Sequence, residues 1–244
     1  IIHAAAMKHV DSAEKQPYEM VKSNIIGSKN IIDVSKENKI PLTVGISTDK
    51  ACSPKSLYGY SKRIMEKMFL EANTDETRFC CTRFGNIAGS SGSVIPLWLN
   101  NKRLNQSLEI TSSQMTRLMI SKEQASQIVE KCIEFTESVN EGFILSKKMK
   151  KVNIIDLAKI ISDNVVEIGI RPGEELSEDL ISEEELPYTN VSNDYIFIFN
   201  KEDKSLDNLP HILNSNNAEK MKNSELSQLV KNVKEDLENK YLYY

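Results

Sequence analysis

Two residues four positions apart carry the first chemical signal in this sequence. Tyr58 and Lys62 lie in the segment LYGYSK, and on a helix this spacing puts both side chains on one face, with about 5–6 Å between their Cβ atoms. A cationic lysine beside a phenol stabilises the phenolate and lowers the pKa of the tyrosine, which could then accept a proton from a hydroxyl group. Taken alone, the pair more often marks two neighbours on a helix surface.

A polar run ahead of this pair strengthens the signal. Thr48, Asp49 and Lys50 follow a predicted buried strand, Leu42–Ser47, which itself ends in a serine. Ligands of α/β proteins collect beyond the carboxyl ends of parallel strands, where charged side chains have no role in the core. The alternative, an exposed turn, does not explain why four polar residues stand together ahead of a helix that carries a tyrosine and a lysine.

The elements that must position these residues alternate between strands and helices. Hydrophobic periodicity predicts strands over Ile1–Ala6, Leu42–Ser47 and Arg78–Phe84, and helices over Pro17–Asn38 and Leu57–Ala72. This alternation favours an α/β protein with a Rossmann-like, doubly wound parallel sheet. Functional residues should follow the strands, which is where the segments HAAAMK, STDK and FGNIAGSSGS occur.

Beyond residue 93 the predicted elements become shorter and mixed. The pattern predicts helices over Val94–Leu104, Ser121–Phe135 (with Ser121 and Gln124 as a capping box) and Ile154–Ile161, strands over Leu108–Thr111, Phe143–Ser146 and Val165–Gly169, and an edge strand over Asp194–Asn200. We expect three regions: 1–93, which carries the polar segments that follow the strands; 94–200, mainly a smaller mixed α/β lobe with some return to the sheet; and 201–244, a polar C-terminal extension. In this extension, Lys201–Asn223 is predicted to pack poorly and a terminal helix to follow.

The composition argues against several broad classes. The 244 residues include 40% hydrophobic and 27% charged side chains with a net charge of −4, which is typical of a globular protein and unlike a nucleic-acid binder. Neither the histidines nor the cysteines (Cys52, Cys80, Cys81, Cys132) have metal-ligand spacing, so we expect no metal site and a reduced, cytoplasmic compartment. No segment reaches the roughly 20 apolar residues of a membrane span. The start, IIHAAAMKHV, is unlike a signal peptide and lacks an initiator Met, so residue 1 is expected to lie inside a larger protein.

Seven segments, taken in order, resemble one enzyme family. They are HAAAMKHV, NIIGSKN, STDKA, LYGYSK, RFGNIAGSSGSVIP, MTRLMI and IRPGEEL. Together they are similar to the signature segments of the inverting UDP-N-acetylglucosamine 4,6-dehydratases, which are extended short-chain dehydrogenases/reductases of the polysaccharide-biosynthesis family. The resemblance spans residues 1 to about 180 and implies that the N-terminal strands of the family's Rossmann domain are missing from this chain. It implies that 1–93 is the C-terminal part of the NAD(P)-binding Rossmann domain with the catalytic residues, and that 94–200 is mainly the substrate lobe.

The resemblance implies a lyase that dehydrates UDP-N-acetylglucosamine and inverts carbon 5, giving a UDP-6-deoxy-4-keto-hexosamine for surface polysaccharide. Tyr58, supported by Lys62, would take the proton of the carbon 4 hydroxyl while the hydride passes to the nicotinamide, and Thr48 would bond the carbon 4 oxygen. Lys50 would then remove the carbon 5 proton as a neutral amine, and Asp49 would protonate the departing hydroxyl at carbon 6. Opposite pKa shifts would suit this acid–base pair.

The same resemblance implies two sets of binding residues. NADP or NAD would lie against Ala4, Ala5, Ala6, Asn24, Ser47, Tyr58, Lys62, Ile87, Gly89 and Ser90. The substrate, a UDP-N-acetylhexosamine, would lie against Lys8, Asn86, Ser93, Val94, Arg117, Arg171 and Glu174. A guanidinium can grip a diphosphate through paired hydrogen bonds, although by position alone both arginines equally suit salt bridges. The resemblance further implies a homo-oligomer.

One departure from the family keeps other functions open. The glycine-rich turn that binds the cofactor's pyrophosphate lies upstream in the family, and no equivalent occurs in this chain. A nucleotide-sugar 4-epimerase could use Tyr58 and Lys62 without elimination, and a non-catalytic remnant could bind a sugar nucleotide. Asp49 and Lys50 favour the dehydratase over the epimerase, because elimination of water requires both an acid and a base.

Overall fold

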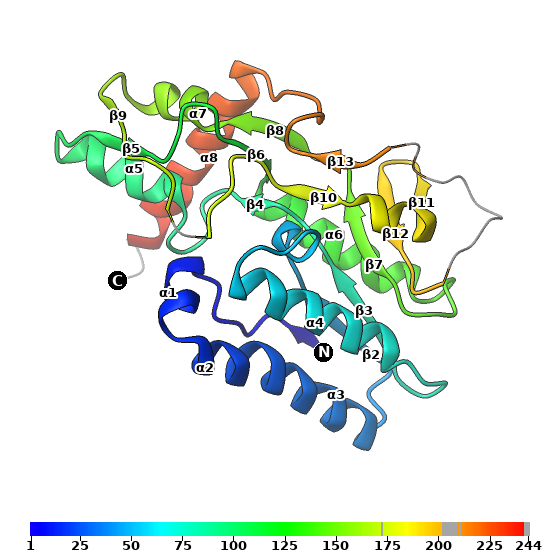
Figure 1. Cartoon of the computed structure of the whole chain (residues 1–244). Helices are drawn as coiled ribbons and strands as arrows, with labels where there is room; N and C mark the ends of the chain where they lie inside the picture. Colours follow the sequence, from blue (N-terminus) through cyan, green and yellow to red (C-terminus); the bar gives the residue numbers. More distant parts are fainter. Residues whose placement is uncertain (172, 202–208, 210, 242–244) are drawn as a thin grey trace. The chain divides into compact units, whose positions relative to one another are not determined.

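The computed structural model describes residues 1–171, 173–201, 209 and 211–241 and divides into two compact units (Figure 1). Unit 1 comprises Ile1–Phe84, Ser126–Lys148 and Asp179–Leu213, and unit 2 comprises Gly85–Ala125, Met149–Glu178 and Asn214–Tyr244. The regions expected from the sequence, 1–93, 94–200 and 201–244, do not coincide with these units. The reason is that segments far apart in the chain share one core, which a contiguous division cannot represent.

A six-stranded sheet forms the centre of unit 1, with the order β1-β2-β3-β7-β12-β11. Its strands are β1 (Ile2–His3), β2 (Leu42–Ile46), β3 (Arg78–Thr82), β7 (Ile144–Lys147), β12 (Tyr195–Ile198) and β11 (Thr189–Ser192). The first four are parallel, and β12 and β11 are antiparallel to their neighbours. The strands are rich in apolar residues because helices cover both faces. The predicted α/β class with a parallel, Rossmann-like sheet is confirmed.

Helices lie on both faces of this sheet (Figure 1). On one face, Phe69 of α4 (Leu57–Glu71) packs edge-on against Phe79 of β3 with ring centroids 5.7 Å apart. On the other face, Cys132 of α6 (Lys122–Phe135) lies 3.1 Å from Cys80, measured between the sulfur atoms. The helix predicted over Pro17–Asn38 is a longer, interrupted one: α1 (Val10–Lys15), α2 (Pro17–Met20), a π-helical turn (Val21–Ile26) and α3 (Gly27–Glu37).

The antiparallel end of the sheet corrects one prediction. Asp194–Asn200 was expected at an edge, but β12 lies between β7 and β11, and β11 is the outer strand. Because both faces of β12 are covered, Ile196, Phe197 and Ile198 are all buried. The preceding segment contains β10 (Asp179–Ile181) and a 3₁₀ helix, Glu183–Tyr188.

Unit 2 is a smaller mixed α/β fold. Its sheet, β4-β6-β8, contains β4 (Asn86–Ile87), β6 (Thr116–Ile120) and β8 (Lys150–Asn153), and a second ladder pairs β5 (Leu108–Ile110) with β9 (Val165–Glu167). Its helices include α5 (Val94–Arg103), α7 (Ile154–Ile161) and α8 (Asn223–Tyr241). Strands β6 and β8 escaped the sequence prediction, since KKVN in β8 resembles a surface turn.

The capping box of α6 is confirmed: the Ser121 amide donates to the Gln124 side chain at 2.9 Å, and the Gln124 amide donates to the Ser121 hydroxyl at 3.2 Å.

The C-terminal region is not a separate polar extension: up to Leu213 it belongs to unit 1, and from Asn214 it belongs to unit 2. Leu226 and Val233 of α8 are buried in the same apolar cluster as Trp98 and Leu157. The expectation of poor packing over Lys201–Asn223 is wrong for its described part, where Leu209, Ser215 and Ala218 are buried; residues 202–208 and 210 lie outside the described chain. The short strand β13 (Leu213–Asn214) lies within this segment. No helix among the described residues is long and apolar enough to cross a membrane.

Candidate active site

A tight turn follows β2 and carries the acid–base candidates. Asp49–Ala51 form one turn of 3₁₀ helix, in which the Ala51 amide donates to the Thr48 carbonyl at 3.1 Å. The Asp49 amide donates to the Phe84 carbonyl at 3.0 Å, so the turn is tied to the segment that leaves β3. Because β2 and β3 are parallel, their carboxyl ends meet at one edge, which is where such sheets bind ligands.

The Asp49 carboxylate is buried, and only one of its two oxygens accepts hydrogen bonds from the described residues. Its Oδ1 accepts hydrogen bonds from the Thr48 hydroxyl at 2.9 Å, the Lys50 amide at 2.9 Å and the Lys50 Nζ at 3.2 Å. Its Oδ2 is also buried but has no hydrogen-bond partner among the described residues. An unsatisfied buried oxygen costs about 1–3 kcal/mol. The turn therefore offers one carboxylate oxygen that a ligand could satisfy.

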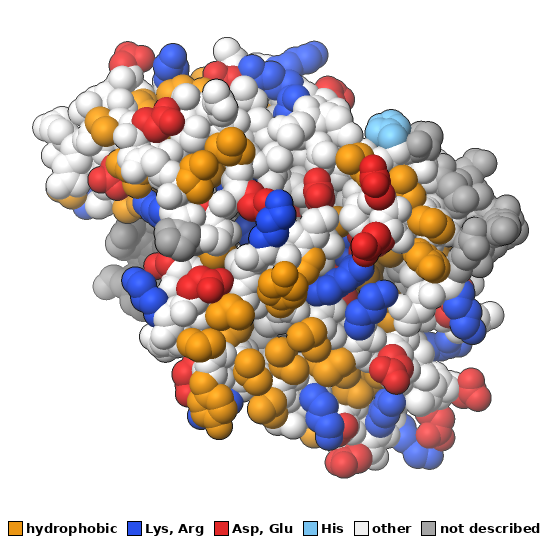
Figure 2. Space-filling model, in the orientation of Figure 1, with side chains coloured by type: hydrophobic (Ala, Val, Ile, Leu, Met, Phe, Trp, Pro, Cys, Tyr) orange, Lys and Arg blue, Asp and Glu red, His pale blue; other side chains and the backbone are white. Residues whose placement is uncertain are grey.

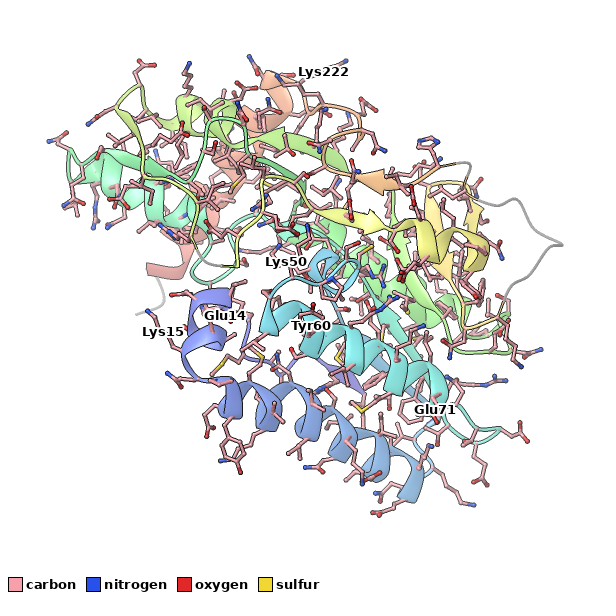
Figure 3. All side chains as sticks on the ribbon, viewed as in Figure 1. Glu14, Lys15, Lys50, Tyr60, Glu71 and Lys222 are labelled. Atoms are coloured by element: carbon pink, nitrogen blue, oxygen red, sulfur yellow. The ribbon has the colours of Figure 1, made fainter. Side chains whose placement is uncertain are left out.

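The start of α4 is fixed against this turn. Ser56 caps the helix by accepting a hydrogen bond from the Gly59 amide at 3.2 Å, and Glu14 of α1 accepts one from the Leu57 amide at 2.9 Å. A Cβ on Gly59 would lie 2.4 Å from the Lys50 carbonyl oxygen, so only glycine allows this approach. Figure 3 shows Lys50 beside the first turn of α4 and Glu14 reaching toward the same turn. This packing brings Tyr58 next to the acid–base turn.

The electrostatics of Tyr58 and Lys62 differ from the sequence prediction. Burial raises the pKa of Tyr58, against which Lys50 and a hydrogen bond with Thr48 act to lower it. The Nζ of Lys62 donates to the Ile46 carbonyl at 2.7 Å, and burial lowers the pKa of Lys62 to about 8. The expectation that Lys62 lowers the pKa of Tyr58 is therefore wrong, because burial dominates and the cation that acts on the phenol is Lys50.

The segment after β1 and the π-helical turn hold the cofactor candidates of unit 1. Ala4 and Ala5 are exposed and Ala6 is half-buried, so small side chains follow β1 at the binding edge. Asn24 is buried in the π-helical turn, a feature often found at functional sites. Its side chain accepts a hydrogen bond from the Met7 amide at 2.8 Å and donates to the Met7 carbonyl at 3.0 Å. Asn24 thus holds the backbone between Ala6 and the exposed Lys8.

Ser47, another cofactor candidate, points away from this edge. Its hydroxyl is buried and donates to a carboxylate oxygen of Glu66 at 2.7 Å. Of the candidates on unit 1, the structure therefore gathers Thr48, Asp49, Lys50 and Tyr58 into one group, with Lys62 one helical turn further along α4.

The remaining candidates lie on unit 2. Two of them have buried oxygens without a hydrogen-bond partner among the described residues: Asn86 at Oδ1 and Ser93 at Oγ. Gly89 has a φ of +73°, which a side chain rarely adopts, and a Cβ there would meet Val233 at 2.9 Å. Half-buried positions are occupied by Ile87, Ser90 and Val94. The unsatisfied oxygens mark Asn86 and Ser93 as the polar groups of this unit that are best prepared for a ligand.

The two arginines of unit 2 have different environments. Arg117 is buried, and its guanidinium donates to the carbonyls of Thr116 at 2.8 Å and Glu175 at 2.7 Å. These bonds suit a structural role for Arg117. Arg171 is exposed, and Glu174 accepts hydrogen bonds from the Thr111 hydroxyl at 2.9 Å and from the Arg171 amide at 3.4 Å. Arg171 is therefore the arginine whose guanidinium is accessible to a diphosphate.

A family model described as "Polysaccharide biosynthesis protein" matches residues 1–201. The chain belongs to this family. A UDP-N-acetylglucosamine 4,6-dehydratase (inverting) of Campylobacter jejuni is 40% identical over 207 residues, which cover 81% of this chain and 60% of the relative. A UDP-glucose 4-epimerase of Rickettsia rickettsii is 35% identical over 205 residues, covering 80% and 59%. The chain thus spans about three fifths of the length of these two relatives.

Solved structures agree with the fold. The X-ray structure of Pen from Bacillus thuringiensis superimposes with a TM-score of 0.87 at 31% identity, covering 96% of this chain and 75% of that one. DesIV, a dTDP-glucose 4,6-dehydratase from Streptomyces venezuelae solved with NAD and TYD bound, has a TM-score of 0.63 at 18% identity, covering 72% and 62%. At that identity DesIV supports the fold alone.

Sequence reasoning missed the residues that support this site from behind. Arg83 and Glu66 are fully buried, and their side chains are paired at 2.7 Å. The available signal was that Glu66 lies four residues beyond Lys62, on the same buried face of α4.

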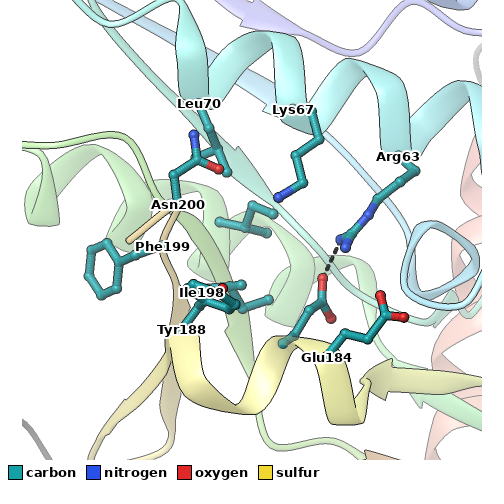
Figure 4. A pocket seen from close by; sticks show the side chains of 10 residues that line it. Arg63, Lys67, Leu70, Glu184, Tyr188, Ile198, Phe199 and Asn200 are labelled. Atoms are coloured by element: carbon teal, nitrogen blue, oxygen red, sulfur yellow. Dashed lines mark hydrogen bonds and ion pairs between the residues drawn. The ribbon is translucent and has the colours of Figure 1, made fainter. Parts of the chain in front are cut away.

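Two pockets of unit 1 also lie near α4, with volumes of about 380 Å³ and 740 Å³. Neither includes Asp49, Lys50 or Tyr58 in its lining, and Figure 4 shows the smaller one, between Arg63 and Lys67 on one side and Glu184 and Tyr188 on the other.

Proposed function

We propose that the protein is a lyase, a 4,6-dehydratase of the UDP-N-acetylhexosamine UDP-N-acetylglucosamine, which oxidises carbon 4, eliminates water across carbons 5 and 6 and inverts carbon 5. The observation that carries the proposal is the adjacent acid and base on the turn after β2. Asp49 has one carboxylate oxygen without a partner among the described residues, and the Lys50 Nζ lies 3.2 Å from the other oxygen. The relative from Campylobacter jejuni with this activity supports the same reaction.

Each residue of the group then has one task. Tyr58 takes the proton of the carbon 4 hydroxyl as carbon 4 gives up its hydride, and Lys50 and the hydrogen bond with Thr48 favour the phenolate against the effect of burial on its pKa. The Thr48 hydroxyl bonds the resulting carbonyl oxygen. Lys50 removes the carbon 5 proton, which the carbon 4 ketone has made acidic. Asp49 gives its proton to the hydroxyl that leaves carbon 6, from the oxygen that has no other partner among the described residues. In the second half-reaction the double bond left between carbons 5 and 6 takes up a hydride at carbon 6 and a proton on the opposite face of carbon 5, which inverts that centre.

The cofactor proposed for this reaction is NADP or NAD, which supplies the acceptor and donor of the hydride when bound. The described residues fit a flat ligand at the edge of the sheet: small side chains at Ala4–Ala6 leave room beyond β1, and Asn24 fixes the backbone at Met7 through two hydrogen bonds. The residues that would hold it are Ala4, Ala5, Ala6, Asn24, Tyr58, Lys62, Ile87, Gly89 and Ser90; Ser47 is left out of this set because its hydroxyl is bonded to Glu66. The substrate would lie against Lys8, Asn86, Ser93, Val94, Arg117, Arg171 and Glu174, with Arg171 the better candidate for the diphosphate.

A 4-epimerase is the second candidate, favoured by the relative of that name from Rickettsia rickettsii. An epimerase needs Tyr58 for the carbon 4 hydroxyl but has no use for a base and an acid aimed at carbons 5 and 6. The group around Asp49 and Lys50 therefore favours the dehydratase.

The deciding experiment uses the protein expressed from its complete gene. It is incubated with UDP-N-acetylglucosamine and NADP in deuterated water, and the sugar is followed by NMR. A 6-deoxy-4-keto product with deuterium at an inverted carbon 5 supports the dehydratase. Formation of UDP-N-acetylgalactosamine would identify an epimerase, and unchanged substrate would contradict both proposals for this sugar.

We also propose that the protein is a homo-oligomer through the face formed by α2 to α4. Figure 2 shows hydrophobic side chains gathered over these helices. The exposed large hydrophobic residues of this part of the chain include Tyr18, Val21, Tyr60 and Ile64, with exposed fractions of 67%, 40%, 52% and 42%. An apolar surface of this kind is typical of a protein interface, and a second copy of the chain offers an equally apolar surface to cover it.

A further inference from the structure

A buried ionic cluster lies behind the acid–base turn of unit 1. Arg83 is fully buried between Glu66, which is 0% exposed, and Glu185, which is 3% exposed. Its guanidinium donates to Glu66 at 2.9 and 2.7 Å and to Glu185 at 2.8 and 2.8 Å. Arg63 of α4 completes the cluster by an ion pair with Glu185, the dashed line in Figure 4. Two guanidinium groups therefore face two carboxylates.

Such a cluster is a poor device for stability alone. Each buried charge loses several kcal/mol of solvation, and apolar side chains of similar volume often replace a buried ion pair without loss of stability. What the cluster supplies is geometry, because four directional bonds from one planar guanidinium fix three separate chain segments relative to one another. These segments are α4, the end of β3, and the 3₁₀ helix at Glu183–Tyr188.

The two carboxylates also hold the two ends of the turn. Ser47, directly ahead of Thr48, donates its hydroxyl to Glu66 at 2.7 Å. Cys52, directly after Ala51, donates its thiol to Glu185 at 3.3 Å. The turn that carries Asp49 and Lys50 is thus bracketed by two bonds to the same cluster.

We propose that Glu66, Arg83 and Glu185 are positioning residues that hold Asp49 and Lys50 in register with Tyr58. This inference rests on the proposed function for its catalytic consequence, but not for the geometry it describes. None of the three side chains belongs to the group that would touch substrate. They act through the backbone of residues 47–52, whose misplacement by even about 1 Å lowers a catalytic rate by about a hundredfold.

The first test is Glu185→Gln, which keeps the shape of the side chain and removes its charge. Glutamine also preserves the capping box that Glu185 forms with Ser182, so the local 3₁₀ helix is retained. We expect kcat to fall by about tenfold or more with KM changed less than about twofold, since positioning acts on the transition state. Amide hydrogen exchange at residues 48–51 should rise by a similar factor in the same variant.

A milder pair keeps the test decisive if Glu185→Gln fails to fold. Cys52→Ala removes one bond to the cluster and should loosen the turn, whereas Cys52→Ser retains a donor and should restore wild-type exchange and kcat. Ser35→Ala is the matched control: it removes another buried hydroxyl of unit 1, bonded to Thr43 at 2.9 Å, away from the turn. It should lower the melting temperature without changing kcat or the exchange of residues 48–51.

The exchange measurement separates this inference from the proposed function. One outcome is that the wild-type protein turns over no nucleotide sugar while Glu185→Gln still raises exchange at residues 48–51. That result would uphold the positioning role and contradict the proposed dehydratase activity. Unchanged exchange and unchanged kcat in both Glu185→Gln and Cys52→Ala would overturn the positioning role, whatever the reaction.

Discussion

At the level of single residues, Asp49 and Lys50 are neighbours in the chain with separable tasks. The Lys50 amine contacts Oδ1 of the carboxylate at 3.2 Å, while Oδ2 is left without a partner among the described residues. The base, the Lys50 amine, can therefore lie against Oδ1 of Asp49 while Oδ2 remains available to carry the acidic proton. Tyr58, packed beside them, would serve the first half of the reaction.

This separation gives a prediction for two variants of the enzyme. Lys50→Ala should lower deuterium exchange at carbon 5 by about 10²- to 10⁴-fold, because a general base is removed, while reduction of the cofactor continues. Tyr58→Phe should instead stop cofactor reduction. The measurements are NMR of the sugar in deuterated water and absorbance of the reduced cofactor. Exchange at the wild-type rate in Lys50→Ala would exclude Lys50 as the base.

Lys62 gives a pH dependence whose sign follows from its burial. Burial lowers the pKa of Lys62 to about 8, whereas an unfolded lysine titrates near about 10.4. Between these values the unfolded chain binds more protons, so this group makes the free energy of unfolding rise as the pH increases from about 8 toward 10.4. Lys62→Met should flatten that rise in denaturant unfolding at several pH values. Parallel pH curves for the variant and the wild type would contradict the shift.

At the level of elements, the close approach of α4 to the turn after β2 depends on one glycine. A Cβ at Gly59 would lie 2.4 Å from the Lys50 carbonyl oxygen, a contact that backbone atoms cannot relieve cheaply. Either the helix or the turn would have to move, and with it the distance between Tyr58 and the acid–base pair.

Gly59→Ala should therefore lower the free energy of unfolding by about 1–3 kcal/mol, as overpacking does, and reduce activity as well. The matched control is Gly27→Ala in α3, where the nearest atom, the Lys22 carbonyl oxygen, is at an ordinary 3.5 Å. That variant should gain about 0.5–1 kcal/mol, because alanine suits a helix better than glycine. Urea unfolding of the two variants and the wild type measures these changes. Equal free energies of unfolding for Gly59→Ala and Gly27→Ala would contradict the argument from close packing.

At the level of the whole molecule, the exposed apolar face over α2 to α4 predicts self-association. Ile64→Glu places a charge in that face and should convert the oligomer to a smaller species in light scattering coupled to size exclusion. Leu97→Glu on α5 is the control: Leu97 is also exposed, at 56%, but lies on unit 2, and its replacement should leave the mass unchanged. A wild-type protein that is already monomeric would contradict the proposed interface.

Much of unit 1 could be predicted from local sequence. The alternation of Leu42–Ser47, Leu57–Ala72 and Arg78–Phe84 determined a parallel α/β sheet, because hydrophobic period and helix length are local properties. The order of residues also fixed that Asp49, Lys50 and Tyr58 would lie near a strand's carboxyl end. Unit 2 was harder, since the short strands β6 and β8 have little periodicity to detect.

Only the tertiary structure decided the energetics of the site and the makeup of its support. The direction of the Tyr58 pKa shift depends on how deeply the phenol is buried and on which cation reaches it, and neither is encoded in a four-residue spacing. The cluster of Glu66, Arg83 and Glu185 joins residues up to 119 positions apart, counted from 66 to 185. No local pattern can reveal such a group, because its members acquire meaning only when the folded chain removes them from water together.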